Sequence, residues 1–141
     1  MQTEIALSFA DGEYLFRLPI KRICEIEEKA GPIDAVKHRL MAGGWGIHDV
    51  VETIRQGLIG GGKGEVNGVE TSVTPLRANS LIDRYVDGHA IGEHLITAQA
   101  IIAALYVGYD PTDGKKKAQA EAESLSESTG EQPSTTASPS D

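Results

Sequence analysis

Apolar and polar residues alternate near the start of the chain, which predicts a β-hairpin over residues 5–18. Asp11-Gly12 is a typical two-residue hairpin turn, because glycine tolerates a positive φ. This turn predicts three cross-strand pairs of apolar residues: Phe9 with Tyr14, Leu7 with Phe16, and Ile5 with Leu18. All six side chains then lie on one face of the hairpin. Since an isolated hairpin is marginally stable in water, this face needs a cover, and we expect the following helix to provide it.

Four to five amphipathic helices are predicted after the hairpin, because apolar residues recur there every three or four positions. The expected ranges are 20–30, 32–41, 47–59, 75–88 and 90–106. Pro19 ends the hairpin, and Thr74 followed by Pro75 is a typical helix start. The apolar side of the first helix is expected to comprise Ile20, Ile23, Cys24, Ile26 and Ala30. The third helix is expected to use Ile47, Val50, Val51, Ile54 and Leu58, and the fourth Leu76, Leu81, Ile82, Tyr85 and Val86.

Two stretches are expected to lie outside these elements. Residues 60–73 are rich in glycine and poor in large apolar groups, which predicts a flexible loop. Beyond Pro111, Leu125 is the only large apolar residue, too little to offset a chain entropy of ~1–2 kcal/mol per residue. We therefore predict an α+β, mainly α fold, with the hairpin packed on a small helical bundle over residues 1–109. A disordered polar tail is expected over residues 110–141.

The charge balance excludes one class of function. The 141 residues carry a net charge of −8 at pH 7, and Lys115-Lys116-Lys117 is the only basic run. Proteins that bind nucleic acid neutralise phosphates with clustered Lys and Arg, so we expect no nucleic-acid partner and no DNA-binding regulator. The longest apolar run, around residues 91–107, is too short and too polar to cross a bilayer, and the N-terminus lacks the pattern of a secretion signal.

The sequence offers few candidates for catalytic chemistry. Residues 57–63 (GLIGGGK) match most of the phosphate-binding pattern GxxxxGK[ST], but Gly64 replaces the required hydroxyl and a helix precedes the glycines. We expect no nucleotide site. The histidines lack the i, i+4 spacing of helical zinc ligands and are expected to be solvated or interfacial: His38, His48, His89 and His94. Cys24 is expected to be a small buried side chain. These observations predict a protein without catalytic, cofactor or metal sites, which is not an enzyme.

Three groups of residues resemble a known family. The matching residues follow the N-terminal hairpin: Cys24, Glu25, Ile26, Glu27, Glu28 and Gly31, then Asp49, Val50, Val51, Gly57 and Leu58. Together they resemble the gene-transfer-agent and phage tail assembly chaperone family, which is also labelled a tail tube family. The resemblance covers roughly residues 4–108. The glycine-rich stretch after Leu58 departs from the family pattern, in which the next helix often follows more directly.

The resemblance implies a role in assembly. Such a chaperone coats the tape measure protein and recruits tail tube subunits in the cytoplasm of the bacterial host, and self-association is compatible with this role. The alternative is a structural tail tube or tail-completion component of the virion. Tube subunits usually need long strands, whereas this sequence predicts a single hairpin, which favours the chaperone.

Residues that could contact a partner are chosen on their chemistry. Trp45, between Gly44 and Gly46, is either an exposed anchor for a partner or a loop side chain folded onto the core. The acidic cluster at residues 25–28 is better explained as the solvated face of a helix than as an acid–base pair. The candidate partner-binding residues are Trp45, Tyr106, Tyr109, Glu25 and Glu28.

Overall fold

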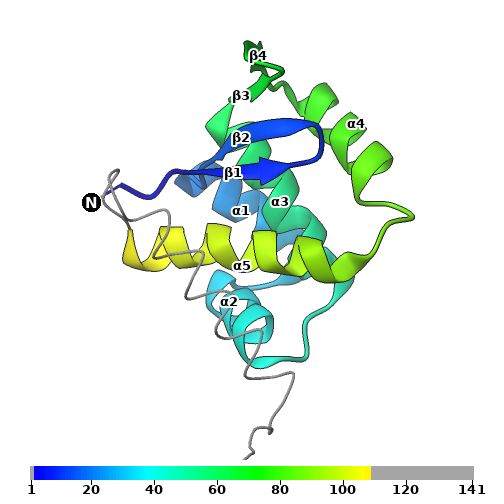
Figure 1. Cartoon of the computed structure of the whole chain (residues 1–141). Coiled ribbons are helices and arrows are strands. Elements are labelled where there is room, and N and C mark those ends of the chain that lie inside the picture. Colours follow the sequence, from blue (N-terminus) through cyan, green and yellow to red (C-terminus); the bar gives the residue numbers. More distant parts are fainter. Residues whose placement is uncertain (1, 109–141) are drawn as a thin grey trace, which may run out of the picture.

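The predicted N-terminal hairpin is present in the computed structural model, which describes residues 2–108 (Figure 1). It consists of β1 (Ile5–Phe9) and β2 (Gly12–Phe16). Ile5 pairs with Phe16 and Phe9 with Gly12, so the predicted register was wrong by two residues. A shift of two residues keeps every side chain on its face. The six predicted apolar side chains are accordingly all buried: Ile5, Leu7, Phe9, Tyr14, Phe16 and Leu18.

The hairpin turn consists of Ala10 and Asp11, not Asp11 and Gly12. Ala10 has a φ of 55°, and a positive φ at the first central residue is typical of type II′ hairpin turns. The Asp11 carboxylate accepts a hydrogen bond of 2.5 Å from the Tyr14 hydroxyl. Gly12 belongs to the strand, where a Cβ atom would lie 2.3 Å from the carbonyl oxygen of Glu65. Packing against a neighbouring strand, not turn geometry, therefore requires glycine at this position.

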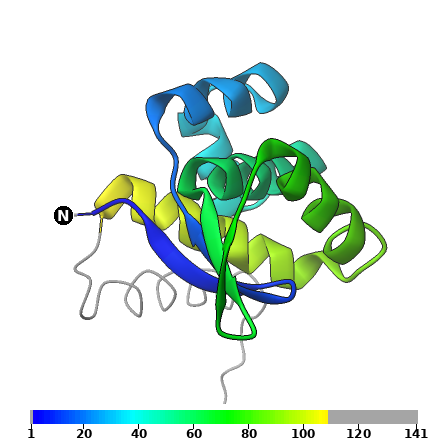
Figure 2. The ribbon, with the colours of Figure 1, turned by 90° about the horizontal axis from the view of Figure 1, so that it is seen from above.

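A second hairpin occupies the stretch that was predicted to be a loop, so that prediction was wrong. Strands β3 (Lys63–Val66) and β4 (Val69–Ser72) are joined by Asn67 and Gly68, with φ values of 53° and 79°. Positive φ at both turn residues defines a type I′ turn, for which Asn-Gly is the preferred sequence. Strand β3 pairs antiparallel with β2, so the sheet has the order β1-β2-β3-β4, and the two hairpins lie next to each other (Figure 2).

The predicted helices are all present among residues 2–108, and the mainly α, α+β fold class is confirmed. The helices are α1 (Ile20–Ala30), α2 (Ile33–Ala42), α3 (Ile47–Gly61), α4 (Pro75–Tyr85) and α5 (Ile91–Val107). Thr74 caps α4 as predicted, because its hydroxyl accepts a 3.2 Å hydrogen bond from the backbone N–H of Arg77. Helix α4 ends three residues earlier than predicted. The predicted tail, residues 110–141, lies outside the described residues.

Helices α3 and α5 cover the apolar face of the hairpin, whereas α1 packs on α3. The expectation that α1 would be the cover was wrong. Ile26 is the only fully buried residue of α1, Cys24 is exposed, and Ile20 is 79% exposed. The predicted burial of Cys24 was therefore also wrong. An amphipathic pattern predicts that a helix packs on something, but it does not specify the partner.

Glycine residues at the end of α3 explain why this helix approaches the hairpin most closely. A Cβ atom on Gly60 would lie 2.0 Å from the carbonyl oxygen of Arg17, and one on Gly61 would lie 1.8 Å from that of Leu15. The backbone N–H of Arg17 donates a 3.1 Å hydrogen bond to the carbonyl of Gly57. The glycine run is thus a site of backbone contact. A helix precedes it and a strand follows it, the reverse of the order in a phosphate-binding loop.

This contact predicts that Gly61→Ala destabilises the protein. The added methyl group collides with the β2 backbone, which cannot move without disturbing the sheet, so we expect a loss of about 2–4 kcal/mol in the free energy of unfolding. Chemical denaturation followed by circular dichroism measures this loss. Gly92→Ala is the matched control, because nothing lies within 4 Å of its Cβ position in α5. Helix propensity predicts a gain of up to about 1 kcal/mol for this variant. Equal effects of the two substitutions would contradict the proposed role of Gly61.

Candidate docking cleft

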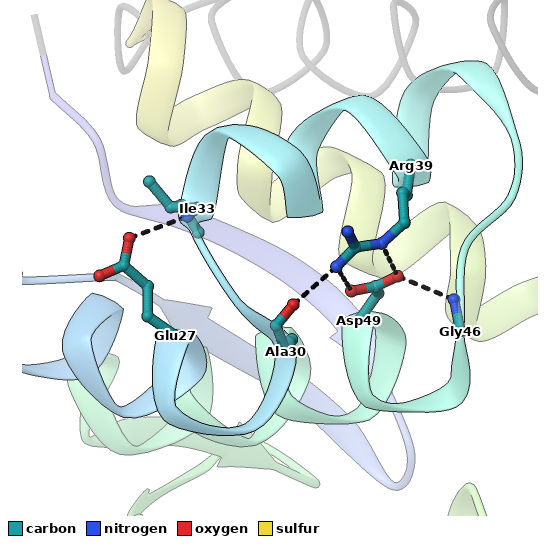
Figure 3. A network of polar contacts seen from close by, with 6 residues as sticks. All are labelled: Glu27, Ala30, Ile33, Arg39, Gly46 and Asp49. Atoms are coloured by element: carbon teal, nitrogen blue, oxygen red, sulfur yellow. Dashed lines mark hydrogen bonds and ion pairs between the residues drawn. The ribbon is translucent and has the colours of Figure 1, made fainter.

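An ion pair between Arg39 and Asp49 joins α2 to α3 (Figure 3). The guanidinium donates two hydrogen bonds to the carboxylate, from Nε to Oδ2 at 2.8 Å and from Nη2 to Oδ1 at 2.7 Å. Nη2 also donates to the carbonyl oxygen of Ala30, the last residue of α1, at 2.7 Å. Bidentate pairs of this kind fix the relative orientation of the two groups. Arg39 therefore ties the ends of three helices together.

Asp49 also holds the loop between α2 and α3. Its Oδ2 atom accepts a 2.8 Å hydrogen bond from the backbone N–H of Gly46, the residue before α3, which is one half of a capping box. Gly43 and Gly44 have φ values of 109° and 86°, a backbone conformation that side chains other than glycine rarely adopt. The position of Trp45 is thus fixed by the turn at Gly43 and Gly44 on one side and by the hydrogen bond from the Gly46 N–H to Asp49 on the other.

The ion pair also determines the protonation of Asp49. Burial of this carboxyl raises its pKa, but the hydrogen bonds from Arg39 and Gly46 and the positive charge of Arg39 outweigh burial, so the pKa is lowered. Asp49, one of the residues that carry the family resemblance, is therefore an anion with a structural role. The sequence pattern indicated only that it lies near a helix N-terminus.

An apolar cleft of about 430 Å³ opens beside this loop, between α3, α4 and the start of α5. Its apolar lining comes from separate segments of the chain: Trp45, Ile47, Val51, Ile82, Val86 and Ile91. Ile82 and Val86 are buried, whereas Trp45, Val51 and Ile91 are half-buried. Ile47 is 53% exposed at the margin, although it was predicted to belong to the buried side of its helix. The cleft thus presents apolar surface to solvent on a preformed frame.

The polar residues around the cleft are acidic or neutral. Asp83, Asp87 and His89 are exposed and line it together with Gly88. No Lys or Arg residue is among the described lining residues. The cleft therefore combines an apolar interior with a negatively charged margin.

The predicted partner-binding residues do not form one site. Trp45 lines the cleft and is half-buried against the core, while its role as an anchor for a partner stays a prediction. Tyr106 is 43% exposed near the other end of α5, about 22 Å from Ile91 along the helix, with the Lys37 ammonium 4.8 Å from its ring centre. Glu25 is half-buried and Glu28 exposed on α1. Tyr109 lies outside the described residues.

The acidic face of α1 has one structural member. The Glu27 carboxylate accepts a 2.8 Å hydrogen bond from the backbone N–H of Ile33, at the first turn of α2 (Figure 3). This bond satisfies one of the N–H groups that a helix start leaves without a partner. Glu27 therefore links α1 to α2, while Glu28 remains solvated as predicted.

The four histidines differ in exposure. His38, His48 and His89 are exposed, but His94 is buried against Phe9, with ring centres 6.0 Å apart. The prediction of solvated or interfacial histidines was therefore wrong for His94. Within residues 2–108, no group of three His, Cys, Asp or Glu side chains is placed to hold a metal ion.

No helix between residues 2 and 108 combines the length and the apolar character needed to cross a bilayer.

Comparison with known proteins gives one match. A family model described as "Phage tail tube protein, GTA-gp10" matches residues 2–108, which coincide with the described domain. Neither the curated proteins nor the solved structures contain a significant match.

The ion pair predicts that Asp49→Asn destabilises the protein. The amide cannot neutralise Arg39, and charged hydrogen bonds contribute more than neutral ones, so we expect a loss of about 2–3 kcal/mol in the free energy of unfolding. The loop would also loosen, which shifts the emission of Trp45. Asp83→Asn is the control, because this aspartate is exposed, and it should change stability by less than about 0.5 kcal/mol.

The lowered pKa of Asp49 predicts a pH dependence of this loss. The stability that ionised Asp49 contributes is fully present above the unfolded-state pKa of about 3.9 and disappears as the pH falls through the folded-state pKa. The difference between wild type and Asp49→Asn should therefore be constant from neutral pH to about pH 5 and shrink below about pH 4. Denaturation curves over this range measure it. A difference that persists undiminished in strong acid would contradict the assignment.

Proposed function

The chain belongs to the GTA-gp10 family of phage tail tube proteins and is a phage tail-related protein, and from this premise we propose that it acts as a tail assembly chaperone. In this role it binds the tape measure protein, keeps it soluble and recruits tail tube subunits during tail polymerisation. The role is non-catalytic and is carried out in the cytoplasm of the bacterial host.

The observation that carries this proposal is the short length of the strands. Each strand within residues 2–108 contains only four or five residues, and helices account for most of the described domain. A tube ring is built from extended strands that run from one subunit to the next, because backbone pairing gives the ring its continuity. Short hairpins held by a glycine-rich helix are better suited to support a helical binding module.

Surface chemistry provides further support. The chain has a net charge of −8 and a half-open apolar cleft. Such a surface is suited to amphipathic helices of a partner, which bury an apolar face in a groove.

A structural tube subunit remains the second candidate. The description of the matching family favours it, and β1 and β4 are the edge strands of the sheet. Edge strands carry backbone groups that could pair with a neighbouring subunit. The two candidates differ in whether the protein stays in the finished particle.

Co-expression and particle composition test the proposal. Expressed together with the tape measure protein of the same genome, the chain should move most of that protein from the pellet to the soluble fraction and co-purify with it. Quantitative mass spectrometry of purified particles should find it far below one copy per tube subunit. Stoichiometric presence in particles would favour the tube subunit, and failure to solubilise the tape measure protein would contradict the chaperone role.

A further inference from the structure

We propose that the cleft between α3, α4 and α5 is the docking site for one amphipathic helix of a partner, whose apolar face is flanked by Lys or Arg. This inference rests on the proposed function, since it identifies the surface and the class of segment that a chaperone of this shape would bind. The arguments come from the exposure of the lining, the charge of the margin and the composition of the rest of the chain.

The exposure of the lining indicates an apolar occupant. Ile47 is 53% exposed and lines the cleft together with Trp45 and the buried Ile82 and Val86. Covering this surface would remove apolar area from water, which contributes roughly 25 cal/mol per Å². A helix places apolar residues at i, i+3, i+4 and i+7 along one face, which is the pattern that fills an elongated groove.

The charge of the margin indicates a basic occupant. Asp83 and Asp87 lie four residues apart and are both exposed at the cleft, without a basic residue in the described lining to neutralise them. Lys or Arg residues beside the apolar face of a bound helix would do so. Complementary charges of this kind increase the association rate and select the correct partner.

The remainder of this chain lacks the composition of such a segment. Residues 109–141 contain three lysines against seven aspartates and glutamates, and beyond Pro111 Leu125 is their only large apolar residue. A segment with that composition would be repelled by the margin and would leave the apolar lining uncovered. The occupant is therefore not this segment, and its basic character indicates a different protein, because this chain has a net charge of −8.

Polar contacts hold the loop and the helices around the cleft in place. The hydrogen bond that the Gly46 N–H donates to Asp49 fixes the loop that carries Trp45, and the ion pair between Asp49 and Arg39 fixes α3 against α2. A preformed groove loses less conformational entropy on binding than a flexible one. The docking surface is thus organised by the polar network beside it.

The test uses the full-length protein and two designed peptides. Trp45 is the only tryptophan of the chain and lines the cleft, so its emission reports binding directly. One peptide is an amphipathic helix of about five turns with a leucine face and lysine flanks, and the other has the same leucine face with glutamate flanks. We expect the lysine peptide to bind and to shift the Trp45 emission, and the glutamate peptide to bind at least tenfold more weakly. The preference should diminish as salt is added.

Matched variants locate the site. Ile47→Ser and the double variant Asp83→Lys with Asp87→Lys should each weaken binding of the lysine peptide about tenfold. Leu76→Ser removes an apolar residue that is 80% exposed on α4 outside the cleft, and Glu70→Lys reverses an exposed charge on β4, also outside the cleft. Both should leave affinity within about twofold of wild type. All the substituted residues are exposed, and circular dichroism verifies that each variant is folded.

Several outcomes would overturn the inference. These are binding of both peptides with equal affinity, loss of binding by the control variants, or a change of oligomeric state in Ile47→Ser, which would identify a second copy as the occupant. The same variants in the co-expression assay separate the two proposals. If Ile47→Ser solubilises the tape measure protein as well as wild type does, the cleft is not the docking site and the chaperone role is retained. If the lysine peptide binds but the protein has no effect on the tape measure protein, the chaperone role is wrong and the cleft is retained as a docking site.

Discussion

The close backbone contact between the end of α3 and strand β2 is the constraint on which the rest of the structure depends. Gly60 and Gly61 let the helix approach the carbonyl groups of Leu15 and Arg17 at distances that exclude any side chain. The contact places α3 directly under the apolar face of the first hairpin, and the chain leaves the helix close enough for β3 to pair with β2. A side chain at either glycine would separate the helix from the sheet and open the core between them.

The same helix organises the candidate docking surface at its other end. Its N-terminal turn carries Asp49, which holds Arg39 of α2 and the backbone of Gly46, and through them the loop with Trp45. One helix therefore supports the sheet by small residues and the cleft by a buried charge. This arrangement separates the part of α3 that packs on the sheet from the part that supports the exposed cleft.

Much of the fold was predictable from local patterns. The hairpin face was predicted correctly, since burial on a strand depends on period-two alternation, and a register error of two residues does not change it. The helices were predicted because their apolar residues recur every three or four positions and because Thr74-Pro75 is a strong local signal. The second hairpin was missed although Asn67-Gly68 is a preferred turn sequence, because β3 and β4 contain only four residues each and lack apolar alternation.

The sequence by itself determined which residues are apolar on each element, where most helices begin and end, and the family to which the chain belongs. The tertiary structure alone decided that α3 and α5, not α1, cover the hairpin, that Cys24 is exposed and that His94 is buried. It also decided that Trp45, Ile82 and Ile91 meet in one cleft. The physical reason is that periodicity records which side of an element avoids water, whereas the partner of that side depends on close approach between residues far apart in the chain.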